Sequence, residues 1–229
     1  MAKTVPVVED IMSANQKIAI ENRTRFNEVG VFAINLMASP GAGKTSVISE
    51  TIKRLEGEYK IAYIDGDVAT SIDADKVSAL NVPAVQINTG GQCHLDAIMI
   101  KNALPKLVLK EIDLLLVENV GNLICPTSFH LGVHRNVLIA SVPEGDDKPY
   151  KYPGMYQGVD GMLLNKMDVI EAFDFRMDYF KQGVDILNPG LSFFPVSCKT
   201  GEGFVDWLDW IRTEIAAFQK TRGEEYEIR

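Results

Sequence analysis

The sequence predicts an α/β fold in which a mainly parallel sheet is flanked by helices on both faces. Short, nearly continuous runs of apolar residues recur along the chain. Such runs are typical of parallel strands, because these are buried on both faces. Segments with a helical apolar period separate the runs, and this repeated alternation favours a mainly parallel sheet.

The expected elements follow one another in a simple order. The first is a helical segment over residues 7–26, where apolar side chains recur with a loose helical period. Strands are expected over residues 31–37, 61–64, 84–87, 112–117, 137–142, 161–164 and 191–196, and later helices over residues 46–55, 94–107, 173–182 and 204–218. We therefore divide the chain into a helical segment (1–28), one α/β domain (29–220) and a charged tail (221–229).

The composition is that of an ordinary soluble protein. The chain has 229 residues, 46% of them hydrophobic, and its 23 basic and 31 acidic side chains give a formal charge of −8. The apolar runs are too short to cross a membrane, and the N-terminus lacks the apolar run of a secretory signal. We expect a cytoplasmic protein with no membrane contact, and the net acidity argues against a nucleic-acid surface.

A glycine-rich loop, ASPGAGKT over residues 38–45, joins the first expected strand to the next helix. This order of strand, loop and helix is that of a P-loop, in which backbone N–H groups and a helix N-terminus bind phosphate. Ala38 stands where the strict pattern has Gly. We expect Lys44 to lie against the β and γ phosphates and act in catalysis, and the Thr45 hydroxyl to ligate Mg²⁺. The nucleotide-binding residues expected in this segment are Gly41, Ala42, Gly43, Lys44, Thr45 and Ser46.

Two later segments predict that the nucleotide is GTP. In Asn165-Lys166-Met167-Asp168, the carboxylate of Asp168 can accept hydrogen bonds from the ring N1–H and the amino group of guanine, whereas adenine has an acceptor at N1. We expect Asn165 to brace the loop and the stem of Lys166 to cover a base face. Ser197-Cys198-Lys199 follows the last strand and would offer backbone N–H groups to the guanine carbonyl oxygen.

Two acidic segments are candidates for contacts near the γ phosphate. Glu118 follows an expected strand and would lie near Mg²⁺, and the N–H of Gly121 would meet the γ phosphate. Asp65-Gly66-Asp67 follows another strand, and we expect Asp67 to hold Mg²⁺ or to orient the attacking water. A plain turn role for the two aspartates stays open at this point.

Cys93, His94 and Cys125 form a candidate metal site. Two thiolates and an imidazole suit Zn²⁺ or Ni²⁺ better than Mg²⁺ or Ca²⁺. We expect Cys93 and His94 to open the helix over residues 94–107, whose N-terminus would lower the pKa of the Cys93 thiol. From these residues alone a packing role is equally open. The remaining Cys and His residues are expected to be non-ligands: Cys198, His130 and His134.

Five segments are more specific than a general nucleotide-binding pattern. They are ASPGAGKT (38–45), DGDVAT (65–70), GGQCHL (90–95), ENVGNLICP (118–126) and PEGDDKP (143–149). Together they resemble the HypB family of GTPases, which help load nickel into [NiFe]-hydrogenase, and the likeness spans about residues 7–220. The N-terminus lacks the Cys-rich or His-rich nickel motif of many members, so we expect no high-affinity nickel binding there.

The resemblance implies a P-loop fold related to UreG and to MinD-like and signal-recognition GTPases. It implies slow hydrolysis of GTP to GDP, a homodimer promoted by GTP, and a metal site at the dimer interface. It also implies the maturation protein HypA and the hydrogenase large subunit as partners. Lys148 would lie near the nucleotide or across the dimer, although a solvated surface role is equally open.

Two other functions remain open from the sequence. One is a UreG-like or cobalamin-related GTPase chaperone for another metal, although UreG would be expected to carry a Cys-Pro-His triplet. The other is a GTP-controlled interaction switch in which Cys93, His94 and Cys125 only pack.

Overall fold

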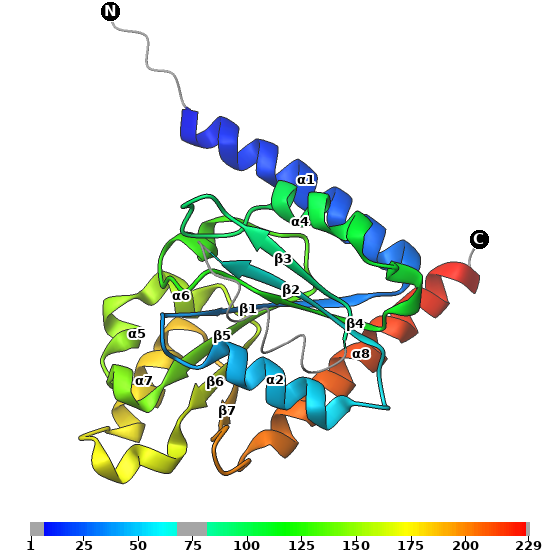
Figure 1. Ribbon diagram of the computed structural model, residues 1–229. Helices are drawn as coiled ribbons and strands as arrows, with labels where there is room; N and C mark the ends of the chain where they lie inside the picture. The colour runs from blue at the N-terminus through cyan, green and yellow to red at the C-terminus, as the bar shows by residue number, and fades with distance from the viewer. Residues whose placement is uncertain (1–6, 68–81, 228–229) are drawn as a thin grey trace, which may run out of the picture.

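The computed structural model describes residues 7–67 and 82–227, with side chains described for residues 11–66 and 82–222. Its seven strands form one parallel sheet in the order β3-β2-β4-β1-β5-β6-β7 (Figure 1). The strands are β1 (Phe32–Ala38), β2 (Ile61–Asp67), β3 (Ala84–Asn88), β4 (Leu114–Glu118), β5 (Arg135–Ser141), β6 (Gly161–Asn165) and β7 (Ser192–Pro195). The expected parallel α/β fold is therefore confirmed.

Helices cover both faces of the sheet. The α-helices are α1 (Val7–Val29), α2 (Lys44–Leu55), α4 (Ala97–Ala103), α5 (Lys148–Lys151), α6 (Pro153–Gln157), α7 (Met177–Leu187) and α8 (Phe204–Glu227). Short 3-10 helices are η1 (Leu104–Lys106), η2 (Leu109–Glu111), η3 (Cys125–Ser128), η4 (Val142–Glu144) and η5 (Met167–Ala172). Figure 1 shows α2 and α8 on one side of the sheet and α1 with α4 on the other.

The central strand β1 divides the apolar core between these layers. Phe32, Ile34 and Leu36 pack on α2 and α8, whereas Ala33 and Met37 face the opposite side. Successive side chains of a strand point to opposite faces, and every residue of β1 is buried. This is why the sequence shows a continuous apolar run here.

Several expected boundaries are corrected. The helix expected over residues 94–107 begins only at Ala97, because the Asp96 side chain caps it by accepting a hydrogen bond from Met99 N at 2.8 Å. Cys93 and His94 therefore lie in the preceding loop and do not open the helix. The helix expected over residues 204–218 is longer, since α8 continues through part of the charged tail to Glu227. The helix expected over residues 173–182 is Met177–Leu187, and α5 and α6 were not expected.

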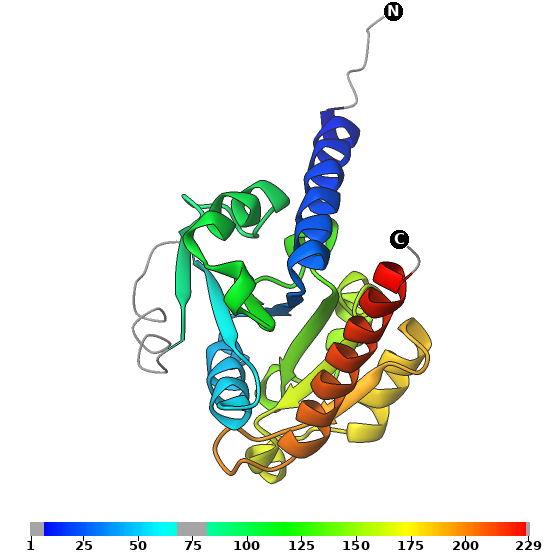
Figure 2. The same cartoon turned by 90° about the vertical axis from the view of Figure 1, so that its right-hand side faces the viewer.

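Helix α1 is fixed to the domain by two buried asparagines. Asn15 Oδ1 accepts a hydrogen bond from Ala97 N at 2.8 Å, and Asn15 Nδ2 donates to His130 O at 2.9 Å. Asn22 Nδ2 donates to the carbonyl oxygens of Ala97 and Leu131, both at 2.9 Å. The helix thus joins the first turn of α4 to the loop before β5, and the two views of the chain show α1 along α4 (Figures 1 and 2).

In the described part of the chain, no helix is long and apolar enough to span a bilayer.

Candidate nucleotide and metal site

The predicted site residues gather at the carboxyl ends of the parallel strands. The P-loop follows β1, Glu118 ends β4 and Asn165 ends β6. β1 lies between β4 and β5, and the chain leaves it to form β2 on one side and later β5 on the other. Such a reversal of strand order opens a crevice at the carboxyl edge of an α/β sheet, where ligands commonly bind.

The P-loop turns sharply at two glycines. Gly41 and Gly43 have φ angles of 80° and 99°, and Gly43 caps α2, which begins at Lys44. A Cβ atom at Gly43 would lie 2.4 Å from Asn165 Nδ2, so only glycine fits. Asn165 Nδ2 donates to Ala42 O at 3.0 Å and Lys166 Nζ donates to Gly41 O at 2.7 Å. The two motifs are therefore in direct contact, with Asn165 bracing the phosphate loop.

The predicted base-reading carboxylate is held in place by the loop after β7. Asp168 Oδ1 accepts a hydrogen bond from Ser197 Oγ at 2.7 Å, and Lys199 Nζ lies 3.9 Å from Asp168 Oδ2. Ser197 N donates to Glu202 O at 3.1 Å and Cys198 N to Asn165 Oδ1 at 3.4 Å. A guanine carbonyl would have to compete for those two N–H groups. Burial raises the pKa of the Cys198 thiol to about 11, which keeps it neutral.

Two oxygen donors that suit Mg²⁺ lie side by side next to the P-loop. Thr45 Oγ1 donates to Glu118 Oε1 at 2.9 Å, and the hydroxyl of Tyr63 donates to Glu118 Oε2 at 2.5 Å. Hydroxyl and carboxylate oxygens are the ligands that Mg²⁺ prefers. The expectation that Asp65 and Asp67 follow the strand is corrected, because both belong to β2. The side chain of Asp67 lies outside the described residues.

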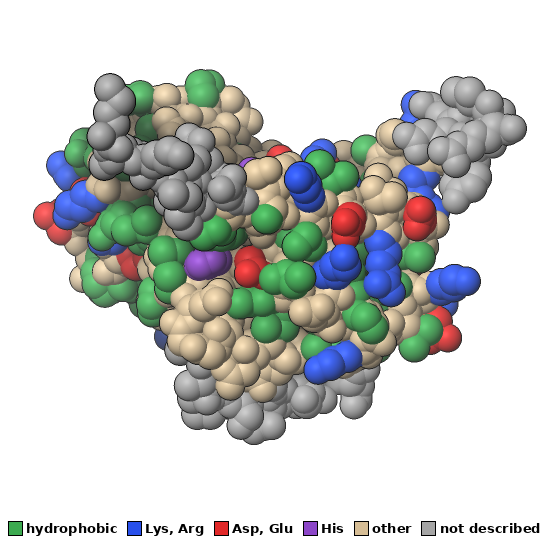
Figure 3. All heavy atoms as spheres, turned by 90° about the horizontal axis from the view of Figure 1, so that it is seen from above, with side chains coloured by type: hydrophobic (Ala, Val, Ile, Leu, Met, Phe, Trp, Pro, Cys, Tyr) green, Lys and Arg blue, Asp and Glu red, His purple; other side chains and the backbone are tan. Residues whose placement is uncertain are grey.

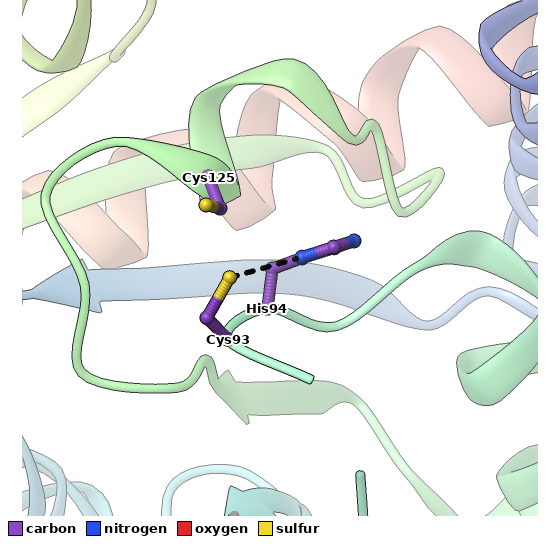
Figure 4. Close-up of side chains that lie close together, drawn as sticks. All are labelled: Cys93, His94 and Cys125. Carbon is purple, nitrogen blue, oxygen red and sulfur yellow. Dashed lines mark hydrogen bonds between the residues drawn. The ribbon is translucent and has the colours of Figure 1, made fainter. Parts of the chain in front are cut away.

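Cys93 and His94, in the loop before α4, come together with Cys125, the first residue of η3. Their ligand atoms all lie within 4.8 Å of one another, and Cys93 Sγ is 3.8 Å from His94 Nδ1 (Figure 4). Two thiolates on one tetrahedral Zn²⁺ would lie roughly 3.8 Å apart, so a small closure of the loops would suffice. The ring of His94 stacks on Phe129, with 3.8 Å between the centroids. Cys93 is exposed, which leaves the cluster accessible from solvent.

The side chains of this cluster interact electrostatically. A hydrogen bond with Cys93 raises the pKa of the Cys125 thiol, and burial and the nearby Cys93 charge raise it further. Burial lowers the pKa of His94, with Asp96 opposing the shift. The imidazole is thus kept in the neutral form that binds metals. Metal binding would have to displace the thiol protons.

Two asparagines connect the loops of the candidate metal cluster with the phosphate loop. Asn122 N donates to Ala38 O at 2.9 Å, and Asn122 Nδ2 donates to Cys93 O at 3.3 Å. Asn119 is fully buried, and its Oδ1 accepts from Leu95 N at 3.0 Å. Between them, a Cβ atom on Gly121 would lie 3.2 Å from the backbone of Pro40. Residues 118–125 therefore contact the P-loop on one side and the Cys93 loop on the other.

Sequence reasoning missed Tyr63, Asn119, Asn122 and Phe129. Asn119 and Asn122 lie within the ENVGNLICP segment, and their position there could have indicated a role in the site. No sequence pattern indicated such a role for Tyr63 or Phe129. Lys148 begins α5, and its Nζ lies 5.8 Å from the Tyr152 ring centroid. The three Cys and His residues expected to be non-ligands are not part of this candidate cluster: Cys198, His130 and His134.

Comparison with known proteins identifies the family. The CobW/HypB/UreG nucleotide-binding domain family matches residues 32–195. The hydrogenase maturation factor HypB of Azotobacter vinelandii is 45% identical over 213 residues, which cover 93% of this chain and 70% of that protein.

Two solved structures are similar in sequence and in fold. The hydrogenase maturation factor HypB of Archaeoglobus fulgidus is 39% identical with a TM-score of 0.83, covering 89% of this chain and 99% of that one. HypB of Helicobacter pylori in complex with nickel is 36% identical with a TM-score of 0.85, covering 89% of this chain and 96% of that one. With its P-loop, its Asn-Lys-Met-Asp loop and its Cys-His-Cys cluster in one fold, the chain belongs to the HypB family of hydrogenase maturation factors.

Proposed function

We propose that this protein is a GTP-hydrolysing metallochaperone that assists nickel insertion into [NiFe]-hydrogenase. The observation that carries the proposal is the position of Cys93, His94 and Cys125, because Asn122 is hydrogen-bonded both to Cys93 and to the start of the phosphate loop. The names of its relatives, which are hydrogenase maturation factors, and the nickel complex of one of them support the same function.

In the proposed reaction, GTP is cleaved to GDP and phosphate. Lys44 would lie against the β and γ phosphates, the N–H of Gly121 would contact the γ phosphate, and Asp168 would select guanine. Thr45 and Glu118 would hold Mg²⁺, which neutralises charge on the phosphates when bound. Asp67, placed by the end of β2 at this edge of the sheet, would orient water or join the magnesium site.

Nickel is the proposed cargo of the Cys93, His94 and Cys125 cluster, and Zn²⁺ suits the same ligands. A tetrahedral ion needs a fourth ligand, which water or a second subunit would supply. We propose a GTP-promoted homodimer that acts in the cytoplasm, with HypA and the hydrogenase large subunit as partners. Lys148 is a candidate for a contact to the nucleotide or across the dimer.

The nucleotide and metal sites are proposed to be coupled through residues 118–125. A γ phosphate that draws in Gly121 would move Asn122 and Cys125, because they lie on the same short loop. By linkage, nucleotide state would then change metal affinity, and metal would change nucleotide affinity by the same factor.

The test measures GTP hydrolysis and Ni²⁺ affinity separately in Cys93→Ser and Cys125→Ser, with Cys198→Ser as the matched control outside the cluster. We expect loss of Ni²⁺ binding with GTP binding retained in the first two variants only. Retained Ni²⁺ binding in both would favour an interaction switch without a metal role. Sedimentation with GDP or a GTP analogue, with and without Ni²⁺, tests the dimer, and a monomer under all conditions would refute it.

A further inference from the structure

A groove at the opposite end of the sheet carries an excess of positive charge. It lies where α1 and α8 meet the first residues of β1 and β5, with a volume of about 260 Å³. Arg23, Arg135 and Arg222 line it together with a single carboxylate, Glu214. In Figure 3, Lys and Arg side chains lie on the right-hand part of the face, with some Asp and Glu side chains among them. This contrasts with a chain whose formal charge is −8.

The carboxylate in the groove is already engaged. Arg135 NH2 and Nε lie 2.7 and 2.8 Å from the same oxygen of Glu214. Arg23 Nε donates to Gly132 O at 2.9 Å, and Arg222 NH2 to Glu28 O at 3.3 Å. Both of these arginines thus donate to neutral carbonyl oxygens, and the charge of Asp160 acts on Arg23 from nearby.

Arg222 also has an unsatisfied donor. Its Nε is buried and has no hydrogen-bond partner among the residues that the structure describes. A buried unpaired donor is unfavourable unless a ligand or water meets it. Burial lowers the pKa of Arg23, and the nearby charge of Arg135 lowers it further. An anion in the groove would relieve the repulsion between the guanidinium groups of Arg23 and Arg135.

Three aromatic rings also line the groove. His134 stacks on Phe32 with 5.0 Å between the ring centroids. The rings of His134 and Phe218 pack edge to face, with 4.5 Å between their centroids. His134 is neutral, since its Nδ1 accepts a hydrogen bond from Ala33 N at 3.0 Å. Gly30 lets the Arg222 guanidinium pack against the backbone, because a Cβ atom there would lie 2.2 Å from Arg222 NH1.

We propose that this groove is a binding site for a small organic carboxylate, separate from the nucleotide and metal sites. The guanidinium groups of Arg23 and Arg222 bind the carboxylate, since a planar guanidinium pairs with carboxylate oxygens through two parallel hydrogen bonds. The apolar body of the ligand packs on Phe218. The groove is smaller than a typical site for a drug-sized ligand, so the occupant is small.

The experiment titrates benzoate into the full chain by calorimetry, with GDP and Mg²⁺ saturating so that the P-loop is filled. We expect saturable binding that weakens about tenfold or more in Arg222→Ala and in Arg23→Ala. Lys220→Ala, which removes an exposed positive charge from the same helix, should bind like wild type. Arg222→Lys keeps the charge but loses the planar pairing, and should also bind more weakly.

Two further probes separate the parts of the proposal. Benzyl alcohol, which has the ring without the charge, should not bind. Inorganic phosphate, which has charge without an apolar body, should bind more weakly than benzoate. Absence of benzoate binding, or equal binding by wild type and both alanine variants, would overturn the site. Equal affinity for phosphate would overturn the assignment of an organic carboxylate.

Discussion

The side-chain amide of Asn122 donates a hydrogen bond to the carbonyl oxygen of Cys93 over 3.3 Å, while its backbone N–H bonds to Ala38 at the start of the phosphate loop. One residue therefore contacts both a loop that carries a proposed metal ligand and the loop that is proposed to hold phosphate. Its Oδ1 also accepts from Ile124 N at 2.8 Å, next to Cys125.

Asn122→Ala should reduce the coupling between the two sites. The variant loses the bond to Cys93 and keeps all three ligands, so Ni²⁺ should still bind. We expect the ratio of Ni²⁺ affinities in the GDP and GTP-analogue states to shrink by about fivefold, since one hydrogen bond contributes roughly 1 kcal/mol. Thr127→Ala is the control, because it removes a hydrogen bond to Ile124 O within the same loop. An unchanged ratio in Asn122→Ala would refute the role of this residue.

Gly43→Ala should abolish GTP binding. The added Cβ atom would collide with Asn165 Nδ2 and displace the amide that braces Ala42. Gly57→Ala is a matched control, because Gly57 has a φ of 81° and nothing within 4 Å of an added Cβ. We expect the control to lose about 1–2 kcal/mol of stability from backbone strain while GTP still binds. Nucleotide affinity and urea unfolding of both variants check this, and GTP binding by Gly43→Ala would contradict it.

Asp168→Asn should change the base preference. Guanine would lose two charge-assisted hydrogen bonds, so GTP affinity should fall about 100-fold or more. Xanthine has a carbonyl where guanine has its amino group, and the Asn amide can donate to it, so XTP should bind better than GTP. Ser197→Ala keeps the carboxylate and removes the hydroxyl at 2.7 Å, so its effect should be much smaller. Competition with fluorescent nucleotides measures all three, and an unchanged preference in Asp168→Asn would exclude this residue as the guanine reader.

His134 should make folding stability fall in acid. Burial, with Arg23 and Arg135 nearby, lowers its pKa from 6.5 to about 3. The unfolded chain therefore binds a proton that the folded chain does not, and stability decreases as the pH falls from about 6.5 towards 3. Each unit of pKa difference corresponds to about 1.4 kcal/mol, so the total is several kcal/mol. Urea unfolding between pH 4 and 7 should show a shallower slope for His134→Asn than for wild type or for the exposed control His130→Asn. Equal slopes in all three would disprove this assignment.

The sequence was sufficient to predict what depends on local pattern. All seven strands were expected because residues buried on both faces leave continuous apolar runs, and the P-loop glycines reflect a local backbone requirement. Cys93 and Cys125 are 32 positions apart in the sequence, so their proximity was inferred from the resemblance of their motifs to those of a family. The structure places the two side chains close together. The start of α4 was misplaced because the Asp96 cap outweighs the apolar pattern around His94.

The missed features depend on contacts between distant parts of the chain. Asn15 bonds to Ala97 and His130, which lie 82 and 115 positions away, and such contacts leave no periodic signal. The hydrogen bond from Leu95 N to Asn119 and the stacking of Phe129 on His94 are contacts of the same kind. Their residue types are ordinary, and only the tertiary structure shows their role.

The two asparagines of α1 bear on the thermodynamics of metal capture. They hold the first turn of α4, three residues after His94, and the loop at His130 and Leu131, which follows η3 and Cys125. Both segments that carry the proposed ligands thus lose conformational entropy when the chain folds. Less entropy remains to be lost when a metal ion binds. Shortening α1 would transfer that entropy loss to the binding step, so the helix preorganises the proposed metal site although it contributes no proposed ligand.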